Sequence, residues 1–190
     1  MSHLNRLALG IAMVLAGCAG TPVTSTVAVA GGATAAAATV LPPVVLHQMA
    51  PNVTFQDGDG TSHTLNEFKG KFVVLAFFAH WCGVCQKEMP VLQQFATDYK
   101  DKNAVVVGIE STGAPPDIVK SFADLITPGM TLYHDTSLAA PKTFLVERFP
   151  TLYIISPDFS VQEAVLGAAS ADYLKARYQL YVTQAASPQP

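Results

Sequence analysis

A continuous apolar run that leads directly into a Cys-x-x-Cys motif is the feature that most constrains how this chain can fold. Residues Phe72–Phe78 are consecutive apolar residues with the length and composition of a buried strand. After Cys85, apolar residues recur at three- and four-residue spacing, which predicts a helix over residues 84–99. Cys82 therefore falls at a helix N-terminus, where unpaired backbone N–H groups and the helix dipole favour a negative charge. We therefore expect the pKa of the Cys82 thiol to be depressed and its sulfur to be nucleophilic. Cys85 lies one turn further along the helix, where it can close a disulfide with Cys82.

Strand and helix patterns alternate along the rest of the chain. A β-hairpin is expected around Asp57-Gly58-Asp59-Gly60, because strand-like segments flank this turn signal, and a second one around Pro157-Asp158-Phe159-Ser160. The expected strands are 53–55, 62–65, 72–78, 104–109, 130–133, 151–155 and 161–166, and the expected helices are 84–99, 117–126 and 171–182, with a weakly helical stretch at 137–147. This order predicts an α/β fold with a mixed central sheet, helices on both faces and an N-terminal β-hairpin. The folded domain is expected over 47–184, with a disordered tail at 185–190.

The first 46 residues predict export and a lipid anchor. Arg6 precedes an apolar stretch at 7–15 that is too short to span a bilayer as a mature helix. Leu15-Ala16-Gly17-Cys18 resembles the bacterial lipoprotein box, which implies a signal peptide at 1–17 and lipid on Cys18; the alternative is an ordinary secretory leader with an incidental cysteine. Residues 19–46 contain no Asp, Glu, Lys or Arg, so 18–46 is expected to be a flexible linker behind the lipidated cysteine.

Charge and cysteine usage narrow the function classes. The net charge is −3, with 11 Lys and Arg against 14 Asp and Glu and no basic stripe, so nucleic acid is not expected as a partner. With Cys18 carrying lipid, the other two of the three cysteines form a pair outside the cytoplasm. A lone Cys-x-x-Cys fits half a zinc site, a structural disulfide or a redox pair. Zinc usually needs four ligands and a structural disulfide closing so small a loop stabilises little, so the redox pair is favoured, without metal or cofactor.

A second motif is the sequence Phe149-Pro150-Thr151 at the start of the strand 151–155. With the Cys-x-x-Cys motif, it makes the chain resemble the thioredoxin-like superfamily, and within it the membrane-anchored, extracytoplasmic thiol-disulfide oxidoreductases of the TlpA/ResA type. The resemblance covers about residues 50–181. The matching segments are Ala50-Pro51, Phe55, Asp57-Gly58, Leu65, Phe68-Lys69-Gly70-Lys71, Phe77-Phe78-Ala79-His80-Trp81-Cys82, Cys85, Glu88-Met89-Pro90, Pro150-Thr151 and Ser156-Pro157-Asp158.

That resemblance implies a thioredoxin-like fold and a dithiol mechanism. Cys82 would attack a substrate disulfide, and the more buried Cys85 would resolve the mixed disulfide, so Cys82–Cys85 is the expected redox-active disulfide. Pro150 would be cis and lie against the pair, turning the backbone of Phe149 towards the sulfurs to bind an extended substrate segment. The alternative is a trans-proline that simply opens a strand.

Several neighbouring residues have two possible roles. Glu88, one turn after Cys85, would either exchange a proton with that thiol or be a solvated helix residue. Trp81 would either pack beside the pair as part of the substrate site or belong to the core. His80 is either a group that tunes the local field or a loop-edge histidine. The superfamily's buried acid, six residues before the first cysteine, is replaced here by Ala76, which leaves Glu88 as the local candidate.

The resemblance also suggests partners. A reducing role towards exported cysteine-containing proteins is favoured over an oxidising one, with a membrane thiol-disulfide donor or acceptor as redox partner and the lipid as membrane anchor. Ala19 after the lipidated cysteine favours the outer membrane in a Gram-negative host. Gly83-Val84 lacks the proline common in the family, and Phe149 is bulkier than usual, so neither the direction nor the client is fixed. The alternative is a Sco-like copper-binding module, although Sco-like proteins have Cys-x-x-x-Cys. A peroxiredoxin-like activity lacks the expected Pro and Thr in residues 76–81.

Overall fold

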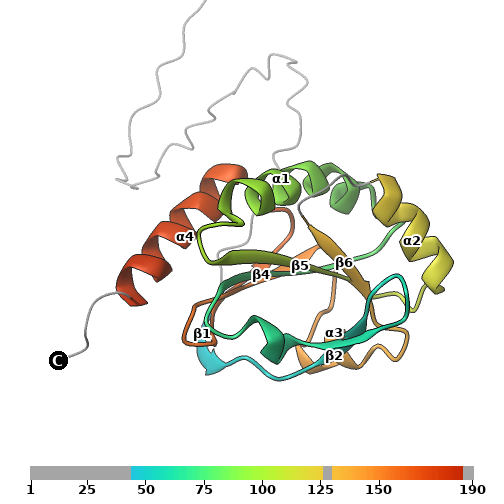
Figure 1. Ribbon diagram of the computed structural model, residues 1–190, viewed down its shortest axis with the longest axis horizontal. Helices are drawn as coiled ribbons and strands as arrows, with labels where there is room; N and C mark the ends of the chain where they lie inside the picture. Colours follow the sequence, from blue (N-terminus) through green and yellow to red (C-terminus); the bar gives the residue numbers. More distant parts are fainter. Residues whose placement is uncertain (1–43, 126–129, 186–190) are drawn as a thin grey trace, which may run out of the picture. The chain divides into compact units, whose positions relative to one another are not determined.

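The computed structural model describes residues 44–125 and 130–185, which form a mixed α/β domain (Figure 1). The strands are β1 (Val44–Met49), β2 (Thr54–Gln56), β3 (Ser62–Thr64), β4 (Phe72–Phe78), β5 (Ala104–Glu110), β6 (Thr131–His134), β7 (Thr151–Ile155) and β8 (Ser160–Leu166). The helices are α1 (Gly83–Tyr99), α2 (Pro116–Leu125), α3 (Ala139–Thr143) and α4 (Ala171–Ala185), with a 3-10 turn, η1 (Leu65–Phe68). The expectations for the signal peptide, for Cys18, for the linker up to residue 43 and for residues 186–190 of the tail lie outside the described residues. The first residue of the expected disordered tail, Ala185, is instead the last residue of α4.

The strands form one eight-stranded sheet in the order β1-β8-β7-β4-β5-β6-β2-β3. Strands β4, β5 and β6 are parallel, and β7 runs antiparallel to β4. The hairpins β2–β3 and β7–β8 are antiparallel, as their turn residues predict. The predicted α/β class, the mixed sheet and the N-terminal hairpin are therefore confirmed.

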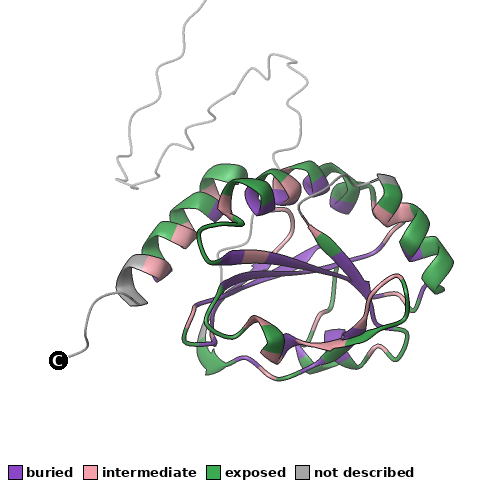
Figure 2. Ribbon diagram, viewed as in Figure 1, coloured by how far each residue is buried: buried purple, intermediate pink, exposed green. Residues whose placement is uncertain are grey.

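Both faces of β4 are covered, which explains its unbroken apolar sequence. Phe72, Val74, Ala76 and Phe78 contact one core, which includes side chains of α1 and α4, whereas Val73, Leu75 and Phe77 contact a second core on the opposite face. Figure 1 shows α1, α2 and α4 on one side of the sheet and α3 on the other, and Figure 2 shows central strands such as β4 and β5 buried between them. Helices on both faces are thus confirmed, with the longer ones all on one side.

A buried carboxylate links α4 to the sheet. Glu163 of β8 is 3% exposed and accepts hydrogen bonds from the hydroxyls of Tyr173 and Tyr181. Arg177 donates to the same carboxylate from Nε at 2.7 Å. A buried charge needs such pairing, so these contacts fix α4 against β8.

Strand β1 is the largest departure from the predicted elements. It begins at Val44, three residues before the predicted start of the domain, and pairs antiparallel with β8. The short segment 44–49 becomes a strand through a long-range partner, which local composition does not indicate. In the stretch that was expected to be weakly helical, 137–147, only Ala139–Thr143 forms a helix.

Candidate active site

The Cys-x-x-Cys pair lies where β4 passes into α1. Cys82 caps the helix in an extended conformation, and its Sγ accepts a hydrogen bond from the backbone N–H of Cys85 at 3.2 Å. The two cysteines form a disulfide with a Cα–Cα distance of 5.2 Å. Cys82 is half-buried and Cys85 is completely buried. The outer sulfur is therefore the one a substrate can reach, and it lies at the positive end of the helix dipole.

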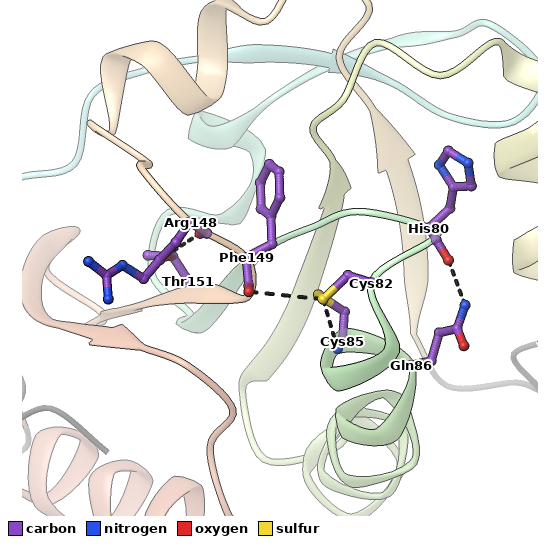
Figure 3. The surroundings of a disulfide bond; sticks show 7 residues. All are labelled: His80, Cys82, Cys85, Gln86, Arg148, Phe149 and Thr151. Atoms are coloured by element: carbon purple, nitrogen blue, oxygen red, sulfur yellow. Dashed lines mark hydrogen bonds between the residues drawn. A yellow bond between two sulfur atoms is a disulfide. The ribbon is translucent and has the colours of Figure 1, made fainter. Parts of the chain in front are cut away.

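The Phe149–Pro150 segment immediately precedes β7, and Figure 3 shows its residue Phe149 beside the outer sulfur. Its peptide bond is cis, and the carbonyl oxygen of Phe149 is 3.9 Å from Cys82 Sγ. The segment is held on both sides, since Thr151 Oγ1 donates to the carbonyl of Arg148 at 2.8 Å and Gly167 N–H donates to that of Pro150 at 2.9 Å. Residues 67 positions apart in sequence thus meet at the disulfide.

Glu88 is buried, so the alternative of a solvated helix residue is wrong. Its side chain lies on the buried face of α1 one turn after Cys85 and is 3% exposed. Oε1 accepts a hydrogen bond from the backbone N–H of Ala169 at 2.6 Å, and Oε2 has no hydrogen-bond partner within the described residues. Burial raises the pKa of Glu88 to about 7, although the hydrogen bond from Ala169 acts in the opposite direction. A carboxyl with this pKa can gain and lose a proton at neutral pH.

Trp81 is a surface residue, so the alternative of a core tryptophan is wrong. Its side chain is 67% exposed, and Val84, inside the motif, is 52% exposed. Half-buried Cys82 thus lies in sequence between two exposed apolar side chains. Exposed apolar side chains at a reactive group are typical of protein-binding surfaces.

Sequence reasoning missed Glu110, which holds the loop before Cys82. Glu110 is the last residue of β5, is completely buried, and accepts a hydrogen bond from Nδ1 of His80 at 3.2 Å. A signal was present in the sequence, because an acidic residue ends an apolar strand parallel to β4. Parallel neighbours end at the same edge of a sheet, which is where the motif begins.

The described residues contain neither a metal-binding cluster nor a membrane-spanning helix. Between residues 44 and 125 and between 130 and 185, no three His, Cys, Asp or Glu side chains gather in a group that could hold a metal ion. None of the described helices is long and apolar enough to cross a bilayer.

Comparisons with known proteins place the chain in a family. A profile described as the AhpC/TSA family matches residues 46–164, which is more than half of the chain. The chain belongs to the AhpC/TSA family. Among known proteins similar to this chain, the thiol-disulfide oxidoreductase ResA of Bacillus thuringiensis subsp. konkukian is 31% identical over 66% of this chain and 72% of its own length. ResA of Oceanobacillus iheyensis is 30% identical over 63% of this chain, and the match spans 62% of that relative.

A solved structure extends the comparison to the fold. A Chlorobium tepidum protein described as a thiol:disulfide interchange protein DsbE superposes with a TM-score of 0.65 at 25% identity, over 72% of this chain and 96% of that one. The thioredoxin-like fold and the resemblance to ResA-type oxidoreductases are therefore confirmed. The relatives' names also agree with the predicted enzyme class, a thioredoxin-like oxidoreductase.

Proposed function

We propose that this chain is an extracytoplasmic thiol-disulfide oxidoreductase that reduces disulfides of exported proteins through Cys82 and Cys85. The observation that carries the proposal is the placement of Cys82. The residue is half-buried, and its sulfur caps α1 beside the N–H of Cys85 and lies 3.9 Å from the carbonyl of Phe149. A thiolate there is stabilised by the helix N-terminus and faces a backbone group that can pair with a substrate strand.

The exchange begins with the reduced pair. The Cys82 thiolate attacks one sulfur of the client disulfide, a mixed disulfide forms, and the other client sulfur leaves as a thiolate. Cys85 then attacks Cys82 Sγ, the second client thiolate leaves, and the chain is left with the Cys82–Cys85 disulfide. Two electrons pass to the client, so a membrane thiol-disulfide donor must reduce the pair again before the next cycle.

Glu88 is the proposed proton acceptor for the second step. Cys85 is completely buried, so its thiol must lose a proton inside the protein before it can attack. Glu88 lies one turn away on the same buried face of α1, and its pKa of about 7 leaves a substantial ionised fraction at neutral pH. The carboxylate takes the proton from Cys85 and returns it to solvent or to the leaving thiolate. In this scheme Trp81 and Phe149 contact the client.

Insulin disulfide reduction tests the activity. The wild-type chain, supplied with a dithiol, is expected to accelerate the reduction, and Cys82→Ser is expected to abolish the acceleration. Retained activity in Cys82→Ser would exclude Cys82 as the attacking residue. The reduction potential of the pair tests the direction. A value near that of thioredoxin, about −270 mV, supports a reductant, and one near about −120 mV supports an oxidant.

We also propose that lipid on Cys18 anchors the protein outside the cytoplasm, by the lipoprotein-box resemblance. Mass spectrometry of the protein from its native membrane fraction is expected to find an acylated Cys18 as the mature N-terminus. Cys18→Ala is expected to release the protein from that fraction. Membrane association that survives this substitution, or a mature N-terminus elsewhere, would exclude the lipid anchor.

A further inference from the structure

The loop between β4 and α1 is held from two sides at His80. The Nδ1 atom of the His80 ring lies 3.2 Å from Oε1 of Glu110 on β5. The backbone carbonyl of His80 accepts a hydrogen bond from Nε2 of Gln86 on α1 at 2.7 Å. Figure 3 shows the His80 ring directed away from the sulfur atoms and its carbonyl directed to Gln86. His80 therefore links the strand layer to the first turns of α1 without contacting the reacting atoms.

Glu110, the acceptor in this link, is buried and is held in place by further hydrogen bonds. It is opposite Phe78 in the parallel register of β4 and β5, and its side chain is 1% exposed. Besides the His80 ring, its carboxylate accepts hydrogen bonds from Thr112 N–H at 3.1 Å, from Thr112 Oγ1 and from Ala114 N–H at 3.3 Å. All of these partners donate, which suits the ionised carboxylate, a group that only accepts.

The charge state of Glu110 follows from these donors. Burial acts to raise its pKa, but hydrogen bonds from Thr112 and His80 outweigh burial and hold that pKa below its ordinary value. Since the ionised carboxylate can only accept, Nδ1 of His80 carries the hydrogen. The Nδ1–H group can donate in the neutral ring as well as in the protonated one, so the link does not require a charged histidine.

We propose that His80 is a positioning residue for the exchange reaction: its link to Glu110 fixes the loop at residues 79–81 and so keeps Cys82 at the N-terminus of α1. The inference rests on the proposed function only where it concerns the rate of disulfide exchange. Without the link, the cap contact between Cys82 Sγ and the N–H of Cys85, and the approach to the carbonyl of Phe149, would both loosen. The thiolate would then lose part of its stabilisation by the helix N-terminus.

The test measures how fast iodoacetamide alkylates Cys82 in the reduced full-length chain between pH 5 and 9. In His80→Leu the rate at pH 6 is expected to fall about two- to fivefold, the range expected when an anion loses its interaction with a helix N-terminus. The midpoint of the pH profile should rise by the corresponding factor, about 0.3 to 0.7 pH units, with the plateau at high pH unchanged. Glu88 titrates in the same range but is present in every variant, so the difference isolates His80.

Two further variants keep the test decisive. His80→Asn retains an N–H donor near the position of Nδ1 and is expected to restore the wild-type profile. Gln86→Leu removes the other contact of His80 from an exposed position and is expected to shift the midpoint in the same direction, even if His80→Leu does not fold. A His80→Leu variant that folds and gives the wild-type profile would overturn the inference, and so would a wild-type profile of Gln86→Leu if His80→Leu does not fold. Insulin reduction by the wild type, measured in parallel, separates a failed positioning role from a failed oxidoreductase.

Discussion

Replacing Glu88 with Gln gives the sharpest test of how this buried carboxyl behaves. The amide oxygen can keep the hydrogen bond from the N–H of Ala169, and the amide nitrogen takes the place of Oε2, which has no partner in the described part of the chain. The substitution therefore removes the ability to ionise while nearly preserving shape. Any pH-dependent difference from the wild type then reports on the ionisation of Glu88 alone.

The sign of that difference follows from the raised pKa. The carboxyl titrates near 4.5 in the unfolded chain and near about 7 in the folded one. Below 4.5 it is protonated in both states and costs no stability. As pH rises between the two values the unfolded chain releases its proton first, so the free energy of unfolding falls, and above about 7 the loss is complete.

The size of the loss follows from the same two values. From pH 5 to 8.5 the wild type is expected to lose about 2.5 kcal/mol from this group, and Glu88→Gln loses none of it. The unpartnered amide nitrogen costs about 1 kcal/mol or more, but it does so at every pH and cancels in the comparison.

Urea unfolding of the oxidised protein at pH 5 and 8.5 measures the effect, and the disulfide keeps Cys82 and Cys85 from titrating. Glu88→Gln should gain about 2.5 kcal/mol relative to the wild type between the two conditions. Glu147→Gln, the same change at an exposed position, is the matched control and should gain about 0.5 kcal/mol or less. Should Glu88→Gln follow the control, Glu88 ionises normally in the folded protein, and its role as proton acceptor at neutral pH loses its basis.

Three further predictions follow from other contacts. Glu88→Gln should slow resolution of the mixed disulfide about 100-fold in stopped-flow assays, with alkylation of Cys82 unchanged; an equal slowing of both would contradict a role in the second step. Glu163→Leu leaves two tyrosine hydroxyls and an arginine of α4 without their acceptor and should cost about 2 kcal/mol in urea unfolding, whereas a neutral effect would show that these groups find other partners. Gly108→Val should cost about 1–3 kcal/mol, because a Cβ there would lie 2.5 Å from Met130 Cε; an unchanged unfolding midpoint would mean that the methionine moves aside freely.

Local patterns predicted the elements that carry the two sulfurs. An unbroken apolar strand followed by three- and four-residue spacing places Cys82 at a helix N-terminus, and the structure has it as the cap of α1. The hairpin turns were equally visible, because Asp57 Oδ1 accepts the N–H groups of Asp59 and Thr61 within a few residues. Signals of this kind depend on contacts near in sequence, so sequence alone supplies them.

The features that local patterns leave open or miss depend on distant partners. Whether Glu88 is solvated or buried is decided by the loop at Ala169, 81 residues away, and helical spacing alone cannot show it. Strand β1 exists through pairing with β8, and the role of Glu110 follows from its register opposite Phe78. Trp81 is apolar but exposed, because it belongs to the loop at the edge of the sheet rather than to a strand between two cores. Apolar residues are usually buried in the core, whereas apolar residues on a surface that binds a substrate are exposed.

The most direct test of the central claim is to trap the mixed disulfide. Cys85→Ser, reduced and mixed with a disulfide-containing client such as insulin, cannot complete the second step and should accumulate a covalent adduct. Peptide mapping by mass spectrometry should find the client cysteine on Cys82, and Cys82→Ser should form no adduct under the same conditions. An adduct on Cys85 in the Cys82→Ser variant, with none on Cys82 in the other, would contradict the assignment of Cys82 as the attacking residue.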